Sequence, residues 1–292
     1  MICIDENAIS VKYVNKKNQR RLWDTQKNIE GVEKWALKKE EQEKKIKKNN
    51  KFLLMERINK VRLISIFIFL VPFLAINICL ILGQIFPYGE VFKIGDAISE
   101  DWRPWLIPYF DGSVSISRVA RVFPSSLIFK PAMLITAFLL INYWLNSKKI
   151  ILEINKNQKY IKLIIFFGVG SAIALALHSV FLGIKFDNDL YKLFRRVVLL
   201  IFIFFEIIAQ AYLVIILYSL KLNLQNYIRT RILKLKMILV SILIIVAIIT
   251  IPYLNSDNYK ILKHALEWNY FMGVICFYVL TSLMWKKQKK MI

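Results

Sequence analysis

The stretch YKLFRRVVLLIFIFFEIIAQAYLVIILYSLK, residues 191–221, decides the fold, because it is apolar for longer than a helix of a water-soluble domain requires. Between Val197 and Ser219 it carries one charged residue, Glu206. About 18 predominantly apolar residues are enough for a helix to cross a bilayer. A lone strand could not satisfy its backbone groups in hydrocarbon, whereas a helix satisfies its own. We therefore predict a transmembrane helix over residues 193–220.

Five further apolar runs of similar length lie on either side of this stretch. They cover residues 63–86, 127–145, 161–184, 232–254 and 264–285. The connections after the second run are short, which favours antiparallel neighbours in a single bundle. The sequence therefore predicts an all-α polytopic membrane protein, a bundle of six transmembrane helices with a long outer loop between the first two.

The basic residues indicate how this bundle is oriented. The net charge is +22, from 42 Lys and Arg against 20 Asp and Glu. The basic residues cluster before the first span, between the second and third, between the fourth and fifth (Lys221, Arg229, Arg231, Lys234 and Lys236) and in the C-terminal KKQKK. The other connections are close to neutral, and 87–126 holds four basic and five acidic residues. This alternation is the positive-inside pattern, so we expect both termini in the cytoplasm, charge that attracts anionic lipids, and no nucleic-acid partner.

Three regions follow from these patterns. Residues 1–60 form a basic cytoplasmic tail, partly helical because helix formers dominate after Gly31. Residues 61–286 form the six-helix transmembrane domain, and 287–292 form a basic cytoplasmic C-terminus. The tail is a solvated segment or an arm that binds a protein partner or the lipid surface. The three cysteines predict no disulfide framework, because the outer loops contain none.

Polar and ionisable residues within spans are candidates for a functional site, because their burial in hydrocarbon is unfavourable unless they are paired or hydrated. The candidates are His178, Arg195, Glu206 and Gln210. Glu206 and Gln210 are four residues apart and share a helix face, and Tyr191, Arg195 and Tyr218 fall near the same stripe. Either the stripe faces a headgroup or a solute, or it joins helices by hydrogen bonds. The small residues of 161–184, Gly168 and Gly170 among them, predict close helix packing.

A second candidate site is the loop PYFDGSVSISRVARVFPSSLIFK, residues 108–130. It carries Asp111, Gly112, Arg118 and Arg121, and the last span begins with Glu267 and Trp268 on the same predicted side of the membrane. We expect these six residues to form an outer polar cluster in which Asp111 and Glu267 accept hydrogen bonds from the arginines. Trp102, Trp105 and Trp268 would anchor the cluster at the interface. The cluster either binds a ligand or only closes the bundle.

Two stretches resemble the DRAM-like membrane proteins (damage-regulated autophagy modulators), whose superfamily includes the Golgi post-GPI-attachment protein and the N-terminal domain of the CWH-type GPI-lipid remodelling proteins. The matching positions are Pro108, Tyr109, Asp111, Gly112, Pro124 and Phe129 in the loop and Glu267 and Trp268 in the last helix. Where the family often has an acidic residue after the second proline, this chain has Ser125. The resemblance covers about residues 60–286 and implies six spans with cytoplasmic ends and a role around membrane lipids, lipid anchors or autophagy.

Catalytic patterns are sparse. The chain has two histidines, His178 and His264, and no arrangement of three ligands around an activated water. It lacks a Gly-x-Ser-x-Gly elbow, and the groups left for an enzyme on the outer face are Asp111, Ser113, Ser115, Ser117 and His264. We therefore expect no cofactor and no metal, and the sequence favours a protein that is not an enzyme.

These observations predict a non-catalytic integral membrane protein that takes part in membrane-lipid organisation or lipid-anchor handling, with membrane lipids as partners. One alternative is a small solute or proton transporter that uses Glu206, Gln210 and His178. Another is a lipid-modifying enzyme. The membrane is the cytoplasmic one if the source is bacterial, and an endomembrane or the plasma membrane if it is eukaryotic.

Overall fold

The computed structural model describes residues 6–85, 107–121, 123–184, 189–250 and 259–287 of the chain. Within these ranges the protein is all-α, and its helices are α1 (Glu6–Ile85), α2 (Pro108–Asp111), α3 (Ile116–Ala120), α4 (Ser125–Ile154), α5 (Ile161–Phe181), α6 (Asp189–Ser219), α7 (Thr230–Thr250) and α8 (Lys260–Met284). Two of the expected interface anchors, Trp102 and Trp105, lie outside the described residues, as does the C-terminus from residue 288.

Six of these helices are long and apolar enough to cross a membrane, which confirms the predicted six-span all-α class. Their candidate spans are Leu37–Gly83, Ser125–Ile154, Ile161–Phe181, Leu193–Ser219, Thr230–Thr250 and Ile261–Met284. Large apolar side chains such as Phe138, Ile173 and Ile245 are exposed on these helices. Such a surface suits hydrocarbon, which imposes no penalty on exposed apolar area.

The chain divides into two compact units, Met1–Leu54 and Met55–Ile292, with the division inside α1. In the first unit the helix begins at Glu6 and includes Gly31, so it extends further than the partly helical tail we expected. Its described side chains as far as Leu53 are exposed, and Lys44 with Glu40 and Lys45 with Glu41 form ion pairs one turn apart at 2.6 and 2.7 Å. Such pairs support a solvated helix.

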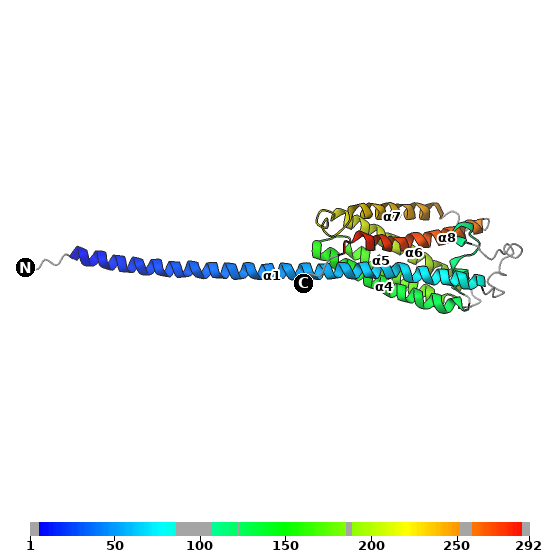
Figure 1. Cartoon of the computed structure of the whole chain (residues 1–292), viewed down its shortest axis with the longest axis horizontal. Coiled ribbons are helices and arrows are strands. Elements are labelled where there is room, and N and C mark those ends of the chain that lie inside the picture. Colours follow the sequence, from blue (N-terminus) through cyan, green and yellow to red (C-terminus); the bar gives the residue numbers. More distant parts are fainter. Residues whose placement is uncertain (1–5, 86–106, 122, 185–188, 251–258, 288–292) are drawn as a thin grey trace, which may run out of the picture. The chain divides into compact units, whose positions relative to one another are not determined.

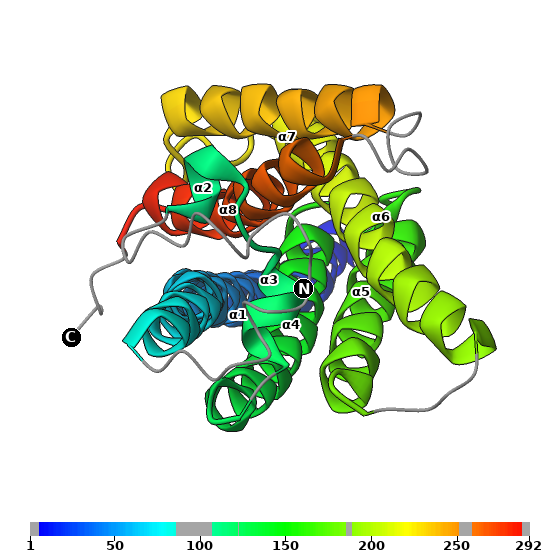
Figure 2. The ribbon, with the colours of Figure 1, turned by 90° about the vertical axis from the view of Figure 1, so that its right-hand side faces the viewer.

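In the second unit, helices α4 to α8 and the part of α1 from Met55 lie alongside one another (Figure 1). Helix α5 lies between α4 and α6 because its glycines permit close approach: a Cβ at Gly170 would lie 2.8 Å from the ring of Phe205 on α6, and Gly168 lies against the ring of Trp144 on α4. Helix α7 lies at one edge, against α6 and α8 (Figure 2). The small residues of 161–184 therefore do pack closely, as predicted.

The short helices α2 and α3 lie across one end of this bundle, which we call the loop end (Figure 2). Pro108 occupies the first turn of α2, where its missing N–H is not needed, and Gly112 ends the helix at φ 59°. Ser115 caps α3 by accepting a hydrogen bond from the Arg118 amide at 3.3 Å. At the opposite end, the α6–α7 connection pairs with the end of α8, through Arg229 N to Met284 O and Lys286 N to Tyr227 O, both 2.8 Å.

Candidate functional site: an apolar cavity between the helices

A cavity of about 340 Å³ lies inside the second unit. It is bounded by α1, α3, α4, α5, α6, α7 and α8, and most of its lining is apolar, including Phe129, Met133, Leu175, Phe202 and Phe271. Its volume falls in the range of small-ligand sites, roughly 300–1,000 Å³. Such a lining suits the hydrocarbon part of an amphiphile.

The cavity reaches the lipid-facing surface of the bundle. Leu200 and Phe204 on α6 and Leu262 on α8 line the cavity, and all three are also exposed. An apolar molecule can therefore enter from the side, through hydrocarbon, without crossing a polar layer.

Polar side chains lie at the loop end of the cavity. They are Ser117 on α3, His178 on α5, and Lys263 and Glu267 on α8. Glu267 lies close to the Ser117 amide and to Arg118, and the Nδ1 atom of His178 is buried with no hydrogen-bond partner. We call this loop end of the cavity its mouth, and it is the part of the cavity that can bind a headgroup.

The cavity floor, farthest from the loop end along α6 and α8, is formed by Glu206 and Tyr278. The Glu206 carboxylate is buried and accepts three hydrogen bonds. Ser171 Oγ donates to Oε2 at 2.6 Å, Gln210 Nε2 donates to Oε1 at 3.0 Å, and the Tyr278 hydroxyl also donates to Oε1. These donors come from α5, α6 and α8, so one carboxylate joins three spans.

Gln210 fixes this arrangement further. Its Nε2 atom also donates to Val274 O on α8 at 3.4 Å, while its Oε1 atom is buried without a partner. Glu206 and Gln210 therefore share an inward face, as their spacing indicates. Tyr218, expected on the same stripe, is 39% exposed, and Lys221 lies over its ring.

Lys236 is a buried residue that the sequence did not single out, because we grouped it with the basic residues of the α6–α7 connection. The structure corrects this placement: Lys236 is 0% exposed on α7. Its Nζ atom donates to Thr281 Oγ1 at 2.7 Å and lies 3.8 Å from the centroid of the Phe277 ring. Both contacts come from α8, whose Tyr278 hydrogen-bonds to Glu206.

Tyr143 on α4 lies between the two buried ionisable groups. Its hydroxyl is 3.5 Å from Thr281 Oγ1, and its ring meets the Tyr278 ring edge-on with 4.9 Å between centroids. The polar groups of α4, α7 and α8 thus continue from the cavity floor toward the end opposite the loop.

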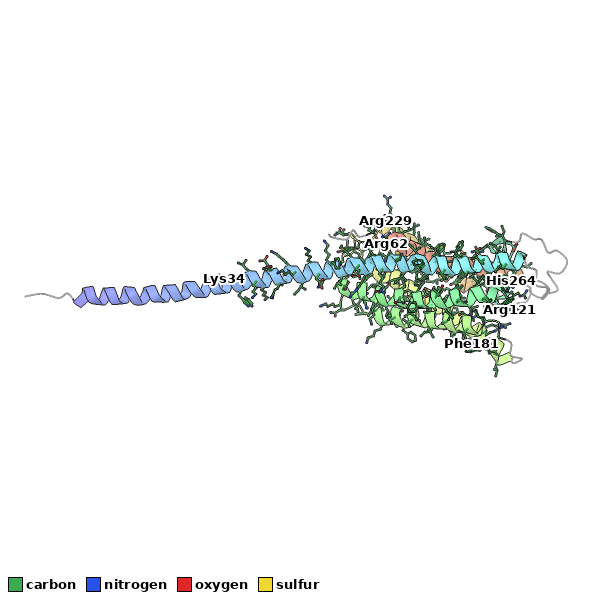
Figure 3. All side chains as sticks on the ribbon, turned by 60° about the horizontal axis from the view of Figure 1, so that its bottom comes forward. Lys34, Arg62, Arg121, Phe181, Arg229 and His264 are labelled. Atoms are coloured by element: carbon green, nitrogen blue, oxygen red, sulfur yellow. The ribbon has the colours of Figure 1, made fainter. Side chains whose placement is uncertain are left out.

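The loop is attached to α8 by Trp268 and its neighbours. Trp268 is 0% exposed, and its indole Nε1 donates to Val114 O at 2.7 Å. Its ring meets the Tyr109 ring edge-on at 4.7 Å, and Asn269 Nδ2 donates to Tyr109 O at 2.7 Å. His264 Nδ1 lies 3.0 Å from Gly112 O, and His264 is labelled at this end of the bundle in Figure 3. The loop motif and the start of the last span therefore contact each other.

The charged residues of the expected outer cluster contact different parts of the loop end. Asp111 Oδ2 accepts from the Ile107 amide and Oδ1 from the Ser113 amide, each at 2.8 Å, so this carboxylate holds its own turn. Within the described residues, neither Arg118 nor Arg121 forms an ion pair with it. Glu267 lies near Arg118, whereas Arg121 lies against the end of α5 at Gly183.

Arg195 lies at the loop end of α6, not in the buried stripe beside Gln210. Its guanidinium carbon is 5.5 Å from the centroid of the Tyr191 ring, and its Nε atom is buried without a hydrogen-bond partner. The Tyr191 hydroxyl donates to Phe181 O at the end of α5 at 2.8 Å.

In the described part of the chain, no three His, Cys, Asp or Glu side chains group in a way that could hold a metal ion. A comparison of this sequence and structure with known proteins finds no matching family model, no matching curated protein and no matching solved structure.

Proposed function

We propose that this membrane protein binds a lipid by taking an acyl chain into its cavity, and that it serves a non-catalytic role in lipid organisation or lipid-anchor handling. The cavity carries this proposal, because it is mostly apolar between its floor and its mouth, reaches the exposed apolar surface of the bundle, and has polar groups at its mouth. We further propose that the loop end faces away from the cytoplasm. Basic residues at the other end support this orientation: Lys148 and Lys149 in the last turns of α4, and Lys156 and Lys159 in the α4–α5 connection.

We also propose membership of the DRAM-like superfamily. The contacts of Trp268 with Tyr109 and Val114 support this proposal, because they join the two stretches in which the resemblance lies. These contacts hold the loop against the last helix, which gives a physical reason for both motifs to occur in one chain.

Filling the cavity tests the lipid-binding proposal. Thr136 on α4 is buried and lines the cavity, so Thr136→Phe should occupy the space that an acyl chain needs. Its neighbour Ile135 is 52% exposed on the other face, so Ile135→Phe adds a similar volume outside the cavity. We expect native mass spectrometry to show one retained phospholipid on the wild type and on Ile135→Phe, and a large loss of bound lipid for Thr136→Phe.

Melting temperatures in detergent separate this effect from misfolding. If Thr136→Phe melts like the wild type and still retains lipid, the cavity is not the binding site. If it fails to fold, Ala247→Phe, which fills the cavity from α7, takes its place with the same expected loss.

A second candidate function is transport of a proton or small solute. The observation that favours it is the presence of Glu206 on the cavity floor together with the buried Lys236 beyond it. In liposomes loaded with a pH-sensitive dye, Glu206→Gln should then abolish a flux that the wild type supports. Absence of flux in the wild type would leave lipid binding as the function.

A further inference from the structure

Three arginines meet at one corner of the loop end, and we call them the guanidinium cluster: Arg118, Arg121 and Arg195. Arg118 and Arg121 lie three residues apart at the end of α3. Arg121 lies against the end of α5, because a Cβ at Gly183 would lie 3.1 Å from Arg121 O. Two residues before Gly183, Phe181 O accepts a hydrogen bond from the Tyr191 hydroxyl. Arg195 lies over the Tyr191 ring. These contacts bring α3, the end of α5 and the start of α6 together, and Arg121 and Phe181 appear at the same end in Figure 3.

The described acidic groups of this corner do not balance the cluster. Asp111 is occupied by the Ile107 and Ser113 amides. Glu267 lies near Arg118 alone. Within the described residues Arg121 and Arg195 form no ion pair, and Arg195 Nε is buried with its hydrogen-bonding capacity unused.

Electrostatics agrees with this geometry. Burial lowers the pKa of the Arg121 guanidinium, and the nearby Arg118 and Arg195 lower it further. An arginine in a protein nevertheless keeps its proton. The cluster therefore holds like charges close together, which is unfavourable unless an anion joins them.

The cluster adjoins the cavity mouth. Ser117, which lines the cavity, precedes Arg118, and His178, which also lines it, lies near Arg195. Lys263 and Glu267 are the other charged groups of the mouth, and His264 is bound to Gly112 O. A molecule whose chain fills the cavity would thus place its polar end within reach of the cluster.

We propose that the guanidinium cluster binds a phosphate group, and that the lipid held by the cavity is therefore a phosphate-bearing one. The planar forks of arginine match phosphate oxygens in pairs. This inference rests on the proposed function for the lipid, but the phosphate site itself does not need it.

Two lipids that differ only in phosphate test the inference: dioleoyl phosphatidate and dioleoylglycerol. Binding of each to the full chain is measured by native mass spectrometry, and inorganic phosphate alone is followed by phosphorus NMR. One or two charge-assisted hydrogen bonds favour phosphatidate by roughly tenfold to a hundredfold. Arg121→Gln and Arg195→Gln should remove most of this preference, whereas dioleoylglycerol binding stays unchanged. Arg195→Lys should retain only part of it, because lysine lacks the fork.

Arg196→Gln is the matched control. Arg196 is the next residue on α6 and is exposed. Its replacement by Gln changes the net charge by the same amount as Arg195→Gln. It should bind both lipids like the wild type, and an equal loss for Arg196→Gln and Arg195→Gln would overturn the site in favour of a general charge effect. Asp187→Asn with Asp189→Asn tests whether these carboxylates, whose side chains are not among those described, neutralise the cluster. The variant should keep the phosphate preference of the wild type, and a preference that appears only in this variant would overturn the proposal.

The outcomes separate the phosphate site from lipid binding. Equal binding of both lipids overturns the phosphate site and leaves the cavity proposal standing. Binding of inorganic phosphate, lost in Arg195→Gln, with neither lipid bound, supports the phosphate site and overturns the lipid function. Melting temperatures equal to that of the wild type exclude misfolding as the cause of any loss.

Discussion

The indole nitrogen of Trp268 donates a 2.7 Å hydrogen bond to the backbone carbonyl of Val114, 154 residues earlier in the chain. This bond joins the last span to the segment that follows α2. Both partners are buried, so neither can exchange the bond for one with water, and its loss leaves a carbonyl unsatisfied.

Trp268→Phe tests this bond, because it keeps most of the ring and removes the donor. We expect a loss of about 1–3 kcal/mol in the free energy of unfolding, measured as a lower melting temperature in detergent. Phe110→Leu is the control, because Phe110 lies in the same loop and is 86% exposed. Similar melting of wild type and Trp268→Phe would show that the bond does not stabilise the loop.

Gly112→Ala tests the turn that brings α2 onto α8. Gly112 has φ 59°, and an added Cβ would run into the backbone carbonyl of Ile261. The conformation alone costs alanine about 1–2 kcal/mol, and the clash adds to it. The melting temperature should fall for Gly112→Ala. It should stay unchanged for Ser113→Ala, which removes only a hydroxyl that lacks a hydrogen-bond partner. A Gly112→Ala protein as stable as the wild type would contradict this account.

Lys236 and Thr281 should respond in opposite directions to apolar replacement. Lys236→Met removes a buried polar amine and keeps the length of the side chain, so we expect an unchanged or higher melting temperature. Thr281→Val removes the hydroxyl and leaves the Lys236 Nζ atom without this partner, which costs about 1–3 kcal/mol. The double variant should recover the stability of Lys236→Met, and failure to recover would indicate that Thr281 acts independently of Lys236.

Tyr278→Phe tests the carboxylate on the cavity floor. It removes one of three donors to Glu206, and a buried acceptor that loses its donor costs about 1–3 kcal/mol. Tyr270→Phe is the matched control, because Tyr270 lies on the same helix and its hydroxyl makes only a 3.4 Å contact with Leu243 O on α7. Thermal unfolding should show the larger loss for Tyr278→Phe.

The proposed orientation can be checked with single cysteines in a cysteine-free background. Phe110, at the loop end, and Leu222, 73% exposed at the opposite end, are each replaced by cysteine. A membrane-impermeant thiol reagent should label Phe110→Cys in intact cells and label Leu222→Cys only after permeabilisation. The reverse pattern would place the basic connections on the outside and contradict the positive-inside assignment.

The six spans could be predicted because hydrocarbon imposes a requirement on each segment separately. Residues 193–220 must be apolar wherever they lie in the bundle, so the signal is local in the sequence. The inward face shared by Glu206 and Gln210 is local too, because it depends only on helical spacing.

The partners of these residues could not be predicted in the same way. Lys236 is one of several basic residues near a span boundary, and its burial depends on Thr281, 45 residues away. The binding of Asp111 to the Ser113 amide is different, because an Asp that accepts from the amide two residues on is a local turn signal. We instead expected Asp111 to face the arginines of the same loop, and the local turn competes with that longer contact.

Helix α8 has a consequence for how the protein is assembled in the membrane. It supplies Tyr278 to Glu206, Thr281 to Lys236 and Trp268 to the loop, and it comes last among the described helices. The earlier spans are therefore synthesised before the Tyr278 donor of Glu206 and the Thr281 partner of Lys236 exist. Insertion of α8 supplies both partners at once, so this step completes the buried polar contacts that join the spans.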